Sequence, residues 1–409
     1  MPTATVLNEK SEPRTFDYGY ARIKELACSA RLIPGDGNRS PKSVVDGITI
    51  DGRKLRPSKR FWTSIQTRFG FSPNMFRYFD HKEVFDRISD RAPNDKIRYC
   101  IERDSAKSES GTLLAVTNPQ AANIRYDQLN DLLTRNNADK VTYANGIIRS
   151  THRPRNGASF KIVGDEFLNQ YVIDTPIDGF GKPSIYLSIL RQICKNGAIG
   201  YGKAFRSEIA TGKTGEEVGF ALIRAMEGFN NEEGYAAMRD RFESAARSWA
   251  SVNEAQRLYK LLTNLLYAGD LETRGRETEG GEVIETASPV IHNFNRMTGD
   301  ISEIYGISNL DTLSIKRQRT LPVACKVYDL FNFATEVASH HSKEFGGRKL
   351  QAYLGDALSN EYDLEGTVDQ FCDYRDFFIN DEKAVSTVKL IQDKKEKADR
   401  SYGRMRTQS

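Results

Sequence analysis

A change of hydrophobic period near residue 200 is the feature that most constrains how this chain can fold. Before it, from about residue 96, apolar residues occur in short β-rich runs such as Ile97–Glu102 (IRYCIE) and Thr112–Thr117 (TLLAVT). The joining segments are short and contain Gly, Asn and Pro, which is typical of antiparallel hairpins and not of strands alternating with helices. We therefore expect an antiparallel β-sheet core over about residues 96–195. The other elements expected there are strands at Val141–Thr151, Ser159–Val163, Phe167–Asp174 and Ile185–Ile193, and a helix near Tyr126–Thr134.

Beyond Gly200 the apolar residues recur at helical spacing. Pro322 suits the first turn of a further helix that we expect to reach His341. The fold class predicted from these patterns is α+β, with an antiparallel sheet followed by a mainly helical C-terminal half. The other helices expected are Val218–Phe229, Tyr235–Ser248, Asn253–Tyr267 and a charged helix at Glu382–Arg400.

The same patterns divide the chain into five segments. The first is polar and without periodicity, so we expect a mobile tail. The expected segments are the tail at residues 1–18, a basic-aromatic N-terminal region at 19–95, the antiparallel sheet core at 96–200, a helical region at 201–345 with a flexible loop at 269–287, and C-terminal helices with a basic tail at 346–409.

Composition narrows the classes of function. No apolar run is long enough to span a bilayer, and the N-terminus lacks the apolar core of a secretory signal, so we expect a cytoplasmic protein without a membrane partner. The five cysteines are far apart with no CxxC pair, and the five histidines are scattered, so we expect no metal site and no cofactor. No catalytic motif such as GxSxG occurs, which favours a non-enzymatic role.

The stretch Arg206–Glu217 (RSEIATGKTGEE) contains Gly212-Lys213-Thr214, the same three residues that end a nucleotide-binding P-loop motif. The match is incomplete because Ser207 occupies the position of the first glycine, and the preceding residues are polar where a buried strand is required. Thr214 and Glu217 instead have the spacing of a capping box at the start of a helix. We favour the cap, and keep Lys213 and Thr214 as a possible anion site because helix N-termini bind anions.

Positive charge gathers between Gly52 and Phe79 (GRKLRPSKRFWTSIQTRFGFSPNMFRYF), where no acidic residue interrupts the lysines and arginines. Cations that follow a phosphate backbone, with rings that stack on bases, are what a single-strand binder uses. Phe61 and other aromatics at helical spacing are also typical of a core face, but Trp62 lies on another face and is the better candidate for stacking. The nucleic-acid contacts expected here are Arg53, Lys54, Arg56, Lys59, Arg60 and Trp62.

A second basic cluster surrounds the expected hairpin turn between residues 149 and 161. It could reach along a nucleic-acid strand, and it could equally be a solvated turn. The contacts expected from it are Arg149, Arg153, Arg155 and Lys161.

Several short motifs resemble a known family. Tyr171–Asp174, Asp178-Gly179 and the run from Ile185 through Cys194-Lys195-Asn196 are similar to the core of the phage/plasmid-like domain-of-unknown-function family (number nine hundred and thirty-two). Val327–Glu336 is similar to its late helix, so the resemblance covers roughly residues 65–345. The histidine common in that family after Gly197 is replaced here by Ser207-Glu208-Ile209, so its role cannot be transferred. The resemblance implies a protein of a phage, plasmid or integrated element in a bacterial host cell.

These observations lead to one leading hypothesis. We expect a non-enzymatic DNA-binding protein of a mobile element that binds or anneals single strands in replication or recombination, as a homo-oligomer. An antiparallel sheet with basic hairpins is also similar, at the level of fold alone, to the single-strand annealing proteins of phage recombination. The alternative is a structural or assembly protein of a virus particle that forms a homo-oligomer. A third possibility is an enzyme acting on nucleotides through Lys213 and Thr214.

Overall fold

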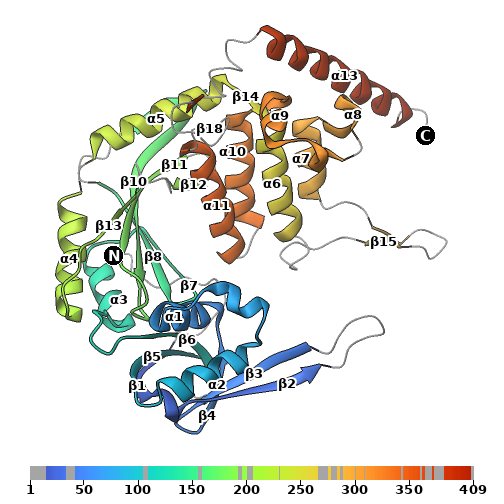
Figure 1. The fold of residues 1–409 in the computed structure, drawn as a ribbon. Helices are drawn as coiled ribbons and strands as arrows, with labels where there is room; N and C mark the ends of the chain where they lie inside the picture. The colour runs from blue at the N-terminus through green and yellow to red at the C-terminus, as the bar shows by residue number, and fades with distance from the viewer. Residues whose placement is uncertain are drawn as a thin grey trace. The chain divides into compact units, whose positions relative to one another are not determined.

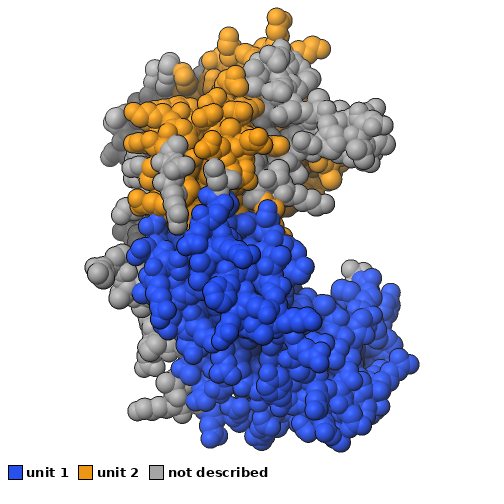
Figure 2. All heavy atoms as spheres, turned by 90° about the vertical axis from the view of Figure 1, so that its left-hand side faces the viewer, with its two compact units in different colours: residues 1–152, 172–185, 207–229 blue, residues 153–171, 186–206, 230–409 orange. Residues whose placement is uncertain are grey.

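The computed structural model has an α+β architecture, which confirms the predicted fold class (Figure 1). Its residues form two compact units, coloured separately in Figure 2. Unit 1 comprises residues 1–152, 172–185 and 207–229, and unit 2 comprises residues 153–171, 186–206 and 230–409. The structure describes residues 15–33, 42–104, 109–154, 159–191, 196–199, 206–229, 231–265, 275–277, 283–285, 289–299, 301–307, 309–341, 344–359, 362–363, 371–372 and 382–406.

Unit 1 contains a six-stranded sheet in the order β1-β5-β6-β4-β3-β2. Its pairs are antiparallel except β4–β6, which is parallel. Because β1 begins at Phe16 and pairs with β5, the sheet starts inside the expected tail and crosses the expected boundary at residue 96. The strands are β1 (Phe16–Arg22), β2 (Ala27–Ile33), β3 (Lys42–Ile50), β4 (Arg53–Pro57), β5 (Lys96–Arg103) and β6 (Gly111–Thr117).

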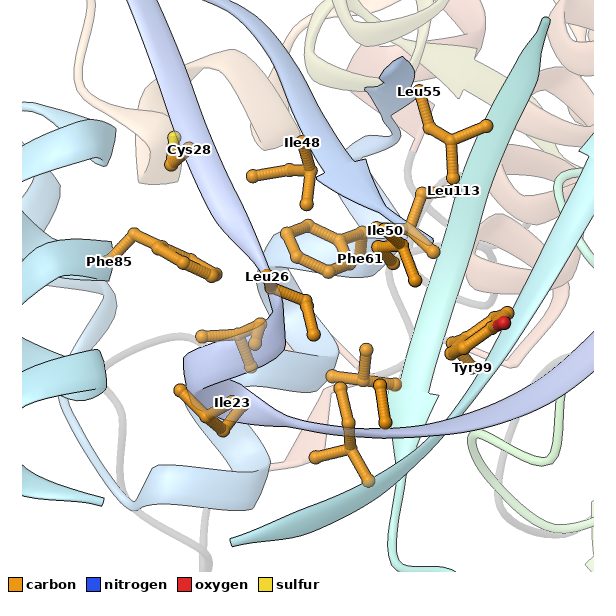
Figure 3. Packing of buried hydrophobic residues seen from close by; sticks show 14 of the residues in the cluster. Ile23, Leu26, Cys28, Ile48, Ile50, Leu55, Phe61, Phe85, Tyr99 and Leu113 are labelled. Carbon is orange, nitrogen blue, oxygen red and sulfur yellow. The ribbon is translucent and has the colours of Figure 1, made fainter. Parts of the chain in front are cut away.

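One face of this sheet packs against helices α1 (Lys59–Phe69) and α2 (His81–Arg91). Figure 3 shows the resulting core, in which Phe61 and Phe85 lie among Cys28 of β2 and aliphatic side chains from β3, β4 and β6. Ser58 caps α1 by accepting a hydrogen bond from the Phe61 N–H at 2.9 Å, and Gly70 ends it in the left-handed conformation. Full burial of one such phenylalanine contributes roughly 1.5–3 kcal/mol.

The opposite face of the sheet carries polar residues, because successive side chains of a strand point to opposite sides. On β5, Ile97, Tyr99 and Ile101 belong to the core cluster, whereas Arg98 and Cys100 alternate with them. This second face is covered too, by α3 (Tyr126–Arg135) and the hairpin of β7 (Lys140–Ala144) and β8 (Ile147–His152). The hydroxyl of Tyr143 donates to Glu102 at 2.8 Å, and Phe16 contacts the rings of Tyr126 and Tyr143.

A second, seven-stranded sheet has the path β12-β11-β10-β8-β7, with β13 paired to β11 and β9 to β10. The β7–β8 turn places Asn145 and Gly146 at φ 45° and 79°, as a type I′ turn requires. Strands are therefore present where they were predicted over residues 97–191, except that the single strand expected at Val141–Thr151 is the β7–β8 hairpin. The single sheet expected there is divided in two, because β5 and β6 belong to the six-stranded sheet. Its remaining strands are β9 (Ser159–Ile162), β10 (Asp165–Pro176), β11 (Ser184–Arg191), β12 (Asn196–Ile199) and β13 (Arg206–Glu208), of which β10, β11 and β13 each contribute residues to both units.

Helices form most of the rest of the described chain. In unit 2, α10 packs against α5, α6 and α11, as Figure 1 shows. The helices are α4 (Gly215–Glu227, in unit 1), α5 (Glu232–Arg247), α6 (Val252–Leu265), α7 (Pro289–Thr298), α8 (Ile301–Tyr305), α9 (Ile315–Thr320), α10 (Val327–Glu336), α11 (Glu344–Ser359) and α13 (Glu382–Arg406).

Three expectations about this half need correction. The helix predicted from Pro322 begins at Val327, because Pro322–Lys326 is strand β17, paired with β14 (Trp249–Ser251) and buried over four residues. Proline is tolerated at the first position of a strand. The expected flexible loop at 269–287 contains the pair β15 (Gly275–Glu277) and β16 (Val283–Glu285), and its other residues lie outside the described ones. The expected loose tail is helical as far as Arg406.

Within the residues that the structure describes, no helix has the length and apolar character needed to cross a membrane.

Candidate anion-binding site

Most of the cations predicted to hold phosphate are paired with aspartates. Arg53 donates to Asp17 at 2.9 Å, Lys54 to Asp46 and Arg56 to Asp104. The acid-free segment therefore meets its carboxylates from other parts of unit 1. The pairs of Lys54 and Arg56 are exposed and contribute little, so phosphate contact by these two stays a prediction. Lys59, the first residue of α1, is also exposed.

The nucleic-acid contacts predicted for Arg60, Arg149 and Trp62 need correction. Arg60 holds the buried Asp178 through Nε and Nη2, and Arg149, 8% exposed, holds Asp174 with two 2.7 Å bonds. Burial raises the pKa of Asp178, and Arg60 opposes that rise. Neither arginine is available to a phosphate while it holds its carboxylate.

Trp62 is 8% exposed and packs edge-on against Phe61, Phe76 and His81, so it cannot stack on a base. It is buried because the segment after α1 covers a second face of that helix, which helical spacing alone does not reveal. In the second cluster, Arg153 and Lys161 are exposed and belong to unit 2, and Arg155 lies outside the described residues.

A polar pocket of about 490 Å³ lies within unit 1, in a place that the basic clusters do not indicate. Its walls come from β1, β5, the start of α3 and the start of α4. Tyr20 and Arg98 are directly opposite each other in the β1–β5 register, so both lie on the polar face of the sheet. The lining residues are Tyr18, Tyr20, Arg98, Asn123, Arg125, Gln128, Thr214, Gly215 and Glu216.

Arg98 is the unusual member of this set. Its side chain is buried, with the residue only 8% exposed, and its Nη1 donates to the carbonyl of Ala121 at 2.7 Å. Its Nε and Nη2 have no hydrogen-bond partner among the described residues. Burial lowers the pKa of the guanidinium, while Tyr20, Cys100 and Asp178 favour its charged form. A buried cation with unpaired donors is costly, and the described residues supply no acceptor to Nε and Nη2.

Other arginines of unit 1 show which ligand this edge accepts. Arg60, Arg103 and Arg149 each use Nε together with Nη2 to hold both carboxylate oxygens of an aspartate. These two nitrogens form a planar fork that matches a carboxylate or a phosphate. In Arg98 the same fork is unoccupied by any described side chain, and Arg98 is one of the residues that line the pocket. Arg98 is therefore the lining residue whose unpaired donors match an oxyanion.

Two helix N-termini adjoin the pocket. Thr214 caps α4 by accepting from the Glu217 N–H at 3.2 Å, and Glu217 accepts in return from the Thr214 N–H at 3.4 Å. The predicted capping box is thus confirmed, and the strand before it, β13, is exposed where a P-loop needs a buried one. Gln128 closes the start of α3 by accepting from the Arg125 N–H. Both helix dipoles place partial positive charge beside the pocket.

The expected pair Lys213 and Thr214 is therefore only partly in the site. Thr214 lines the pocket, whereas Lys213 has an exposed side chain and its N–H donates to Glu217. Arg125 is exposed and stands over the Tyr18 ring at 5.6 Å. Glu216 is the carboxylate in the lining, and it opposes binding of an anion on its side of the pocket.

A glycine turn makes room for Arg98. Gly179 has φ +75°, and a Cβ there would collide with Arg98 Nη2. Gly215 is similarly constrained, since its Cβ would lie 2.6 Å from the carbonyl oxygen of Asn123. Any side chain at these two positions would thus push into the wall of the pocket.

Comparison with known proteins adds no assignment: no family model, curated protein or solved structure matches this chain. The phage/plasmid family likeness therefore remains a resemblance. Arg98 and the tyrosines of β1 were not among the residues predicted from the sequence. A signal for Arg98 was present, because a charged residue in the middle of the predicted strand Ile97–Glu102 must either reach solvent or require a partner.

Proposed function

We propose that this protein binds a nucleic-acid strand through unit 1, with one phosphate of the strand held by Arg98. The observation that carries the proposal is the Nε–Nη2 fork of Arg98, which is buried and without a described partner, on a residue that lines a polar pocket. Phosphate and carboxylate both fit such a fork, and phosphate is favoured here because two helix N-termini lie beside it.

An exposed ring favours an unpaired strand as the ligand. Tyr20 is 66% exposed, lines the pocket and lies opposite Arg98 on the neighbouring strand. A base attached to the bound phosphate can stack on this ring only if it is not paired within a duplex, and such stacking contributes about 1–3 kcal/mol per base. Tyr20 thus takes the role that the sequence analysis gave to Trp62.

The wider parts of the proposal rest on the resemblance alone. They are a non-enzymatic role in the replication or recombination of a mobile element, and assembly into a homo-oligomer. No catalytic step is proposed at the pocket, since the start of α4 is a capped helix and not a P-loop.

The experiment is fluorescence anisotropy of a labelled single-stranded oligonucleotide with the wild type, Arg98→Gln and Arg56→Gln. Both substitutions remove one positive charge, but Arg56 is exposed, paired with Asp104 and outside the pocket lining. Loss of a charged, bidentate contact of about 1.5–3 kcal/mol weakens binding about 10- to 150-fold, so Arg98→Gln should fall in this range and Arg56→Gln within about twofold. Equal losses for the two variants would show that general surface charge, and not the pocket, binds the strand.

Salt dependence gives an independent measurement. The nine cations expected from sequence would give a slope of log affinity against log salt of about −6, whereas one or two phosphates at the pocket give about −1. A slope of zero would exclude any phosphate contact.

A further inference from the structure

We infer that the pocket is built for the terminal phosphate of a strand, a phosphomonoester, rather than for a phosphodiester within it. This inference rests on the proposed function and specifies its substrate. Three features of unit 1 lead to it: the positive charge at Arg98, the charges of the residues around it, and the volume of the pocket.

Positive potential is concentrated at a single position. The Arg98 fork is buried, and the N-termini of α3 and α4 lie at the same pocket. A phosphomonoester carries a second negative charge above a pKa near 6 and offers three terminal oxygens, whereas a diester has one charge and two such oxygens. In a poorly solvated site the doubly charged group gains more from each of these donors.

The rest of the lining is mixed in charge, because it contains both Arg125 and Glu216. Glu216 lines one side of the pocket, and the exposed cations Lys54 and Arg56 of the same unit are held by aspartates. A strand that passed through the pocket would carry a further phosphate on each side of Arg98. A neighbour on the side of Glu216 would meet that carboxylate, whereas a strand that ends in the pocket brings only one neighbour and can avoid it.

The pocket has room for more than a bare ion. Its volume of about 490 Å³ lies within the range of about 300–1,000 Å³ that is usual for organic ligands. A terminal nucleotide can place its phosphate on Arg98 and its base beside Tyr20, which is directly across the β1–β5 pair. The ligand class is therefore a single strand that carries a phosphate at one end.

The test uses three oligonucleotides of one sequence, bearing a 5′-phosphate, a 3′-phosphate, or hydroxyl groups at both ends. Dissociation constants are measured for the full-length wild type, Arg98→Gln and Arg56→Gln at constant ionic strength. We expect one phosphorylated strand to bind at least tenfold tighter than the hydroxyl strand. The difference should vanish in Arg98→Gln and persist in Arg56→Gln, and the preferred strand identifies which end enters.

The outcomes separate the two proposals. If all three strands bind alike and all weaken in Arg98→Gln, a diester enters the pocket and the terminal-phosphate inference is overturned while the proposed function stands. If no strand weakens in Arg98→Gln, both are overturned.

Because Arg98 is buried, a second measurement avoids the risk that its variant does not fold. Inorganic phosphate should displace the phosphorylated strand from the wild type far more effectively than chloride at the same ionic strength. Equal displacement by the two ions would overturn the inference.

Discussion

Replacing Arg98 by methionine should stabilise unit 1 while it removes anion binding. Arg98 has two buried donors without a described partner, and each such group costs about 1–3 kcal/mol. The substitution also removes the Nη1 bond to Ala121, which contributes about 1.5–3 kcal/mol in the opposite direction. Relief of the buried charge adds to the gain, so the expected net effect is a stabilisation of about 1–3 kcal/mol.

Arg149→Met is the matched control. Arg149 is as buried as Arg98, lies in the same unit and presents the same fork, but its fork holds Asp174. Removing it leaves a largely buried carboxylate without that partner, which costs about 3–5 kcal/mol. Two arginines of equal burial are therefore expected to give effects of opposite sign.

Native-state hydrogen exchange read by mass spectrometry is the suitable assay, because a chain with two units need not unfold in one step. Amides of β5 and β6 report on unit 1. Their protection should rise about tenfold for each 1.4 kcal/mol in Arg98→Met and fall in Arg149→Met. A phosphorylated strand at 100 times its dissociation constant should add about 2.7 kcal/mol to the wild type and nothing to Arg98→Met. If Arg98→Met destabilises β5 and β6 as Arg149→Met does, Arg98 is a structural residue and the argument for the pocket is wrong.

Three further predictions concern unit 1. Thr214→Ala removes the cap of α4 and should destabilise that helix by about 1 kcal/mol, seen as faster exchange of its amides and no change in those of α1. Phe61→Ala should cost about 3–5 kcal/mol in denaturant unfolding, against less than about 0.5 kcal/mol for the exposed Lys59→Ala. Burial lowers the pKa of His152 to about 4, so the unfolded chain takes up its proton first and stability is lost as pH falls from about 6.5 towards 4. Between pH 6.5 and pH 5 the wild type should lose about 2 kcal/mol more than His152→Gln, and equal losses would contradict the assigned burial.

The spacing of apolar residues was enough to predict the strands and helices that have one apolar and one polar face. The alternation in β7 and β8 and the helical spacing in α4, α5 and α6 each follow from one apolar face. Strand β1 (FDYGYAR) was missed because Ala21 is its one buried residue, so the strand shows no alternation of buried and exposed positions. Strand β17 was assigned to a helix because a proline starts a strand as readily as it starts a helix.

The candidate site could not be predicted in the same way, because it depends on which charges meet. Arg60 and Asp178 are 118 residues apart, and Arg103 and Asp17 are 86 apart. A window free of acidic residues says nothing about carboxylates that the fold brings to it, so the cations chosen from Arg53 to Arg60 were largely the paired ones. The Asp178-Gly179 motif, by contrast, joins adjacent residues, and Gly179, at φ 75°, leaves the space that Arg98 fills.

The difference between paired and unpaired arginines also bears on why position 98 holds an arginine. The aspartates at positions 17, 174 and 178 lie where they complete the forks of Arg103, Arg149 and Arg60, so those arginines are explained by the fold. For Arg98 the described residues supply one acceptor, the Ala121 carbonyl, and leave the fork without a partner on a residue that lines the pocket. An apolar residue of similar length would fill the same space at lower free energy. A residue that lowers stability where it stands is best explained by a ligand that completes it, and stabilisation of the wild type by that ligand would directly support this explanation.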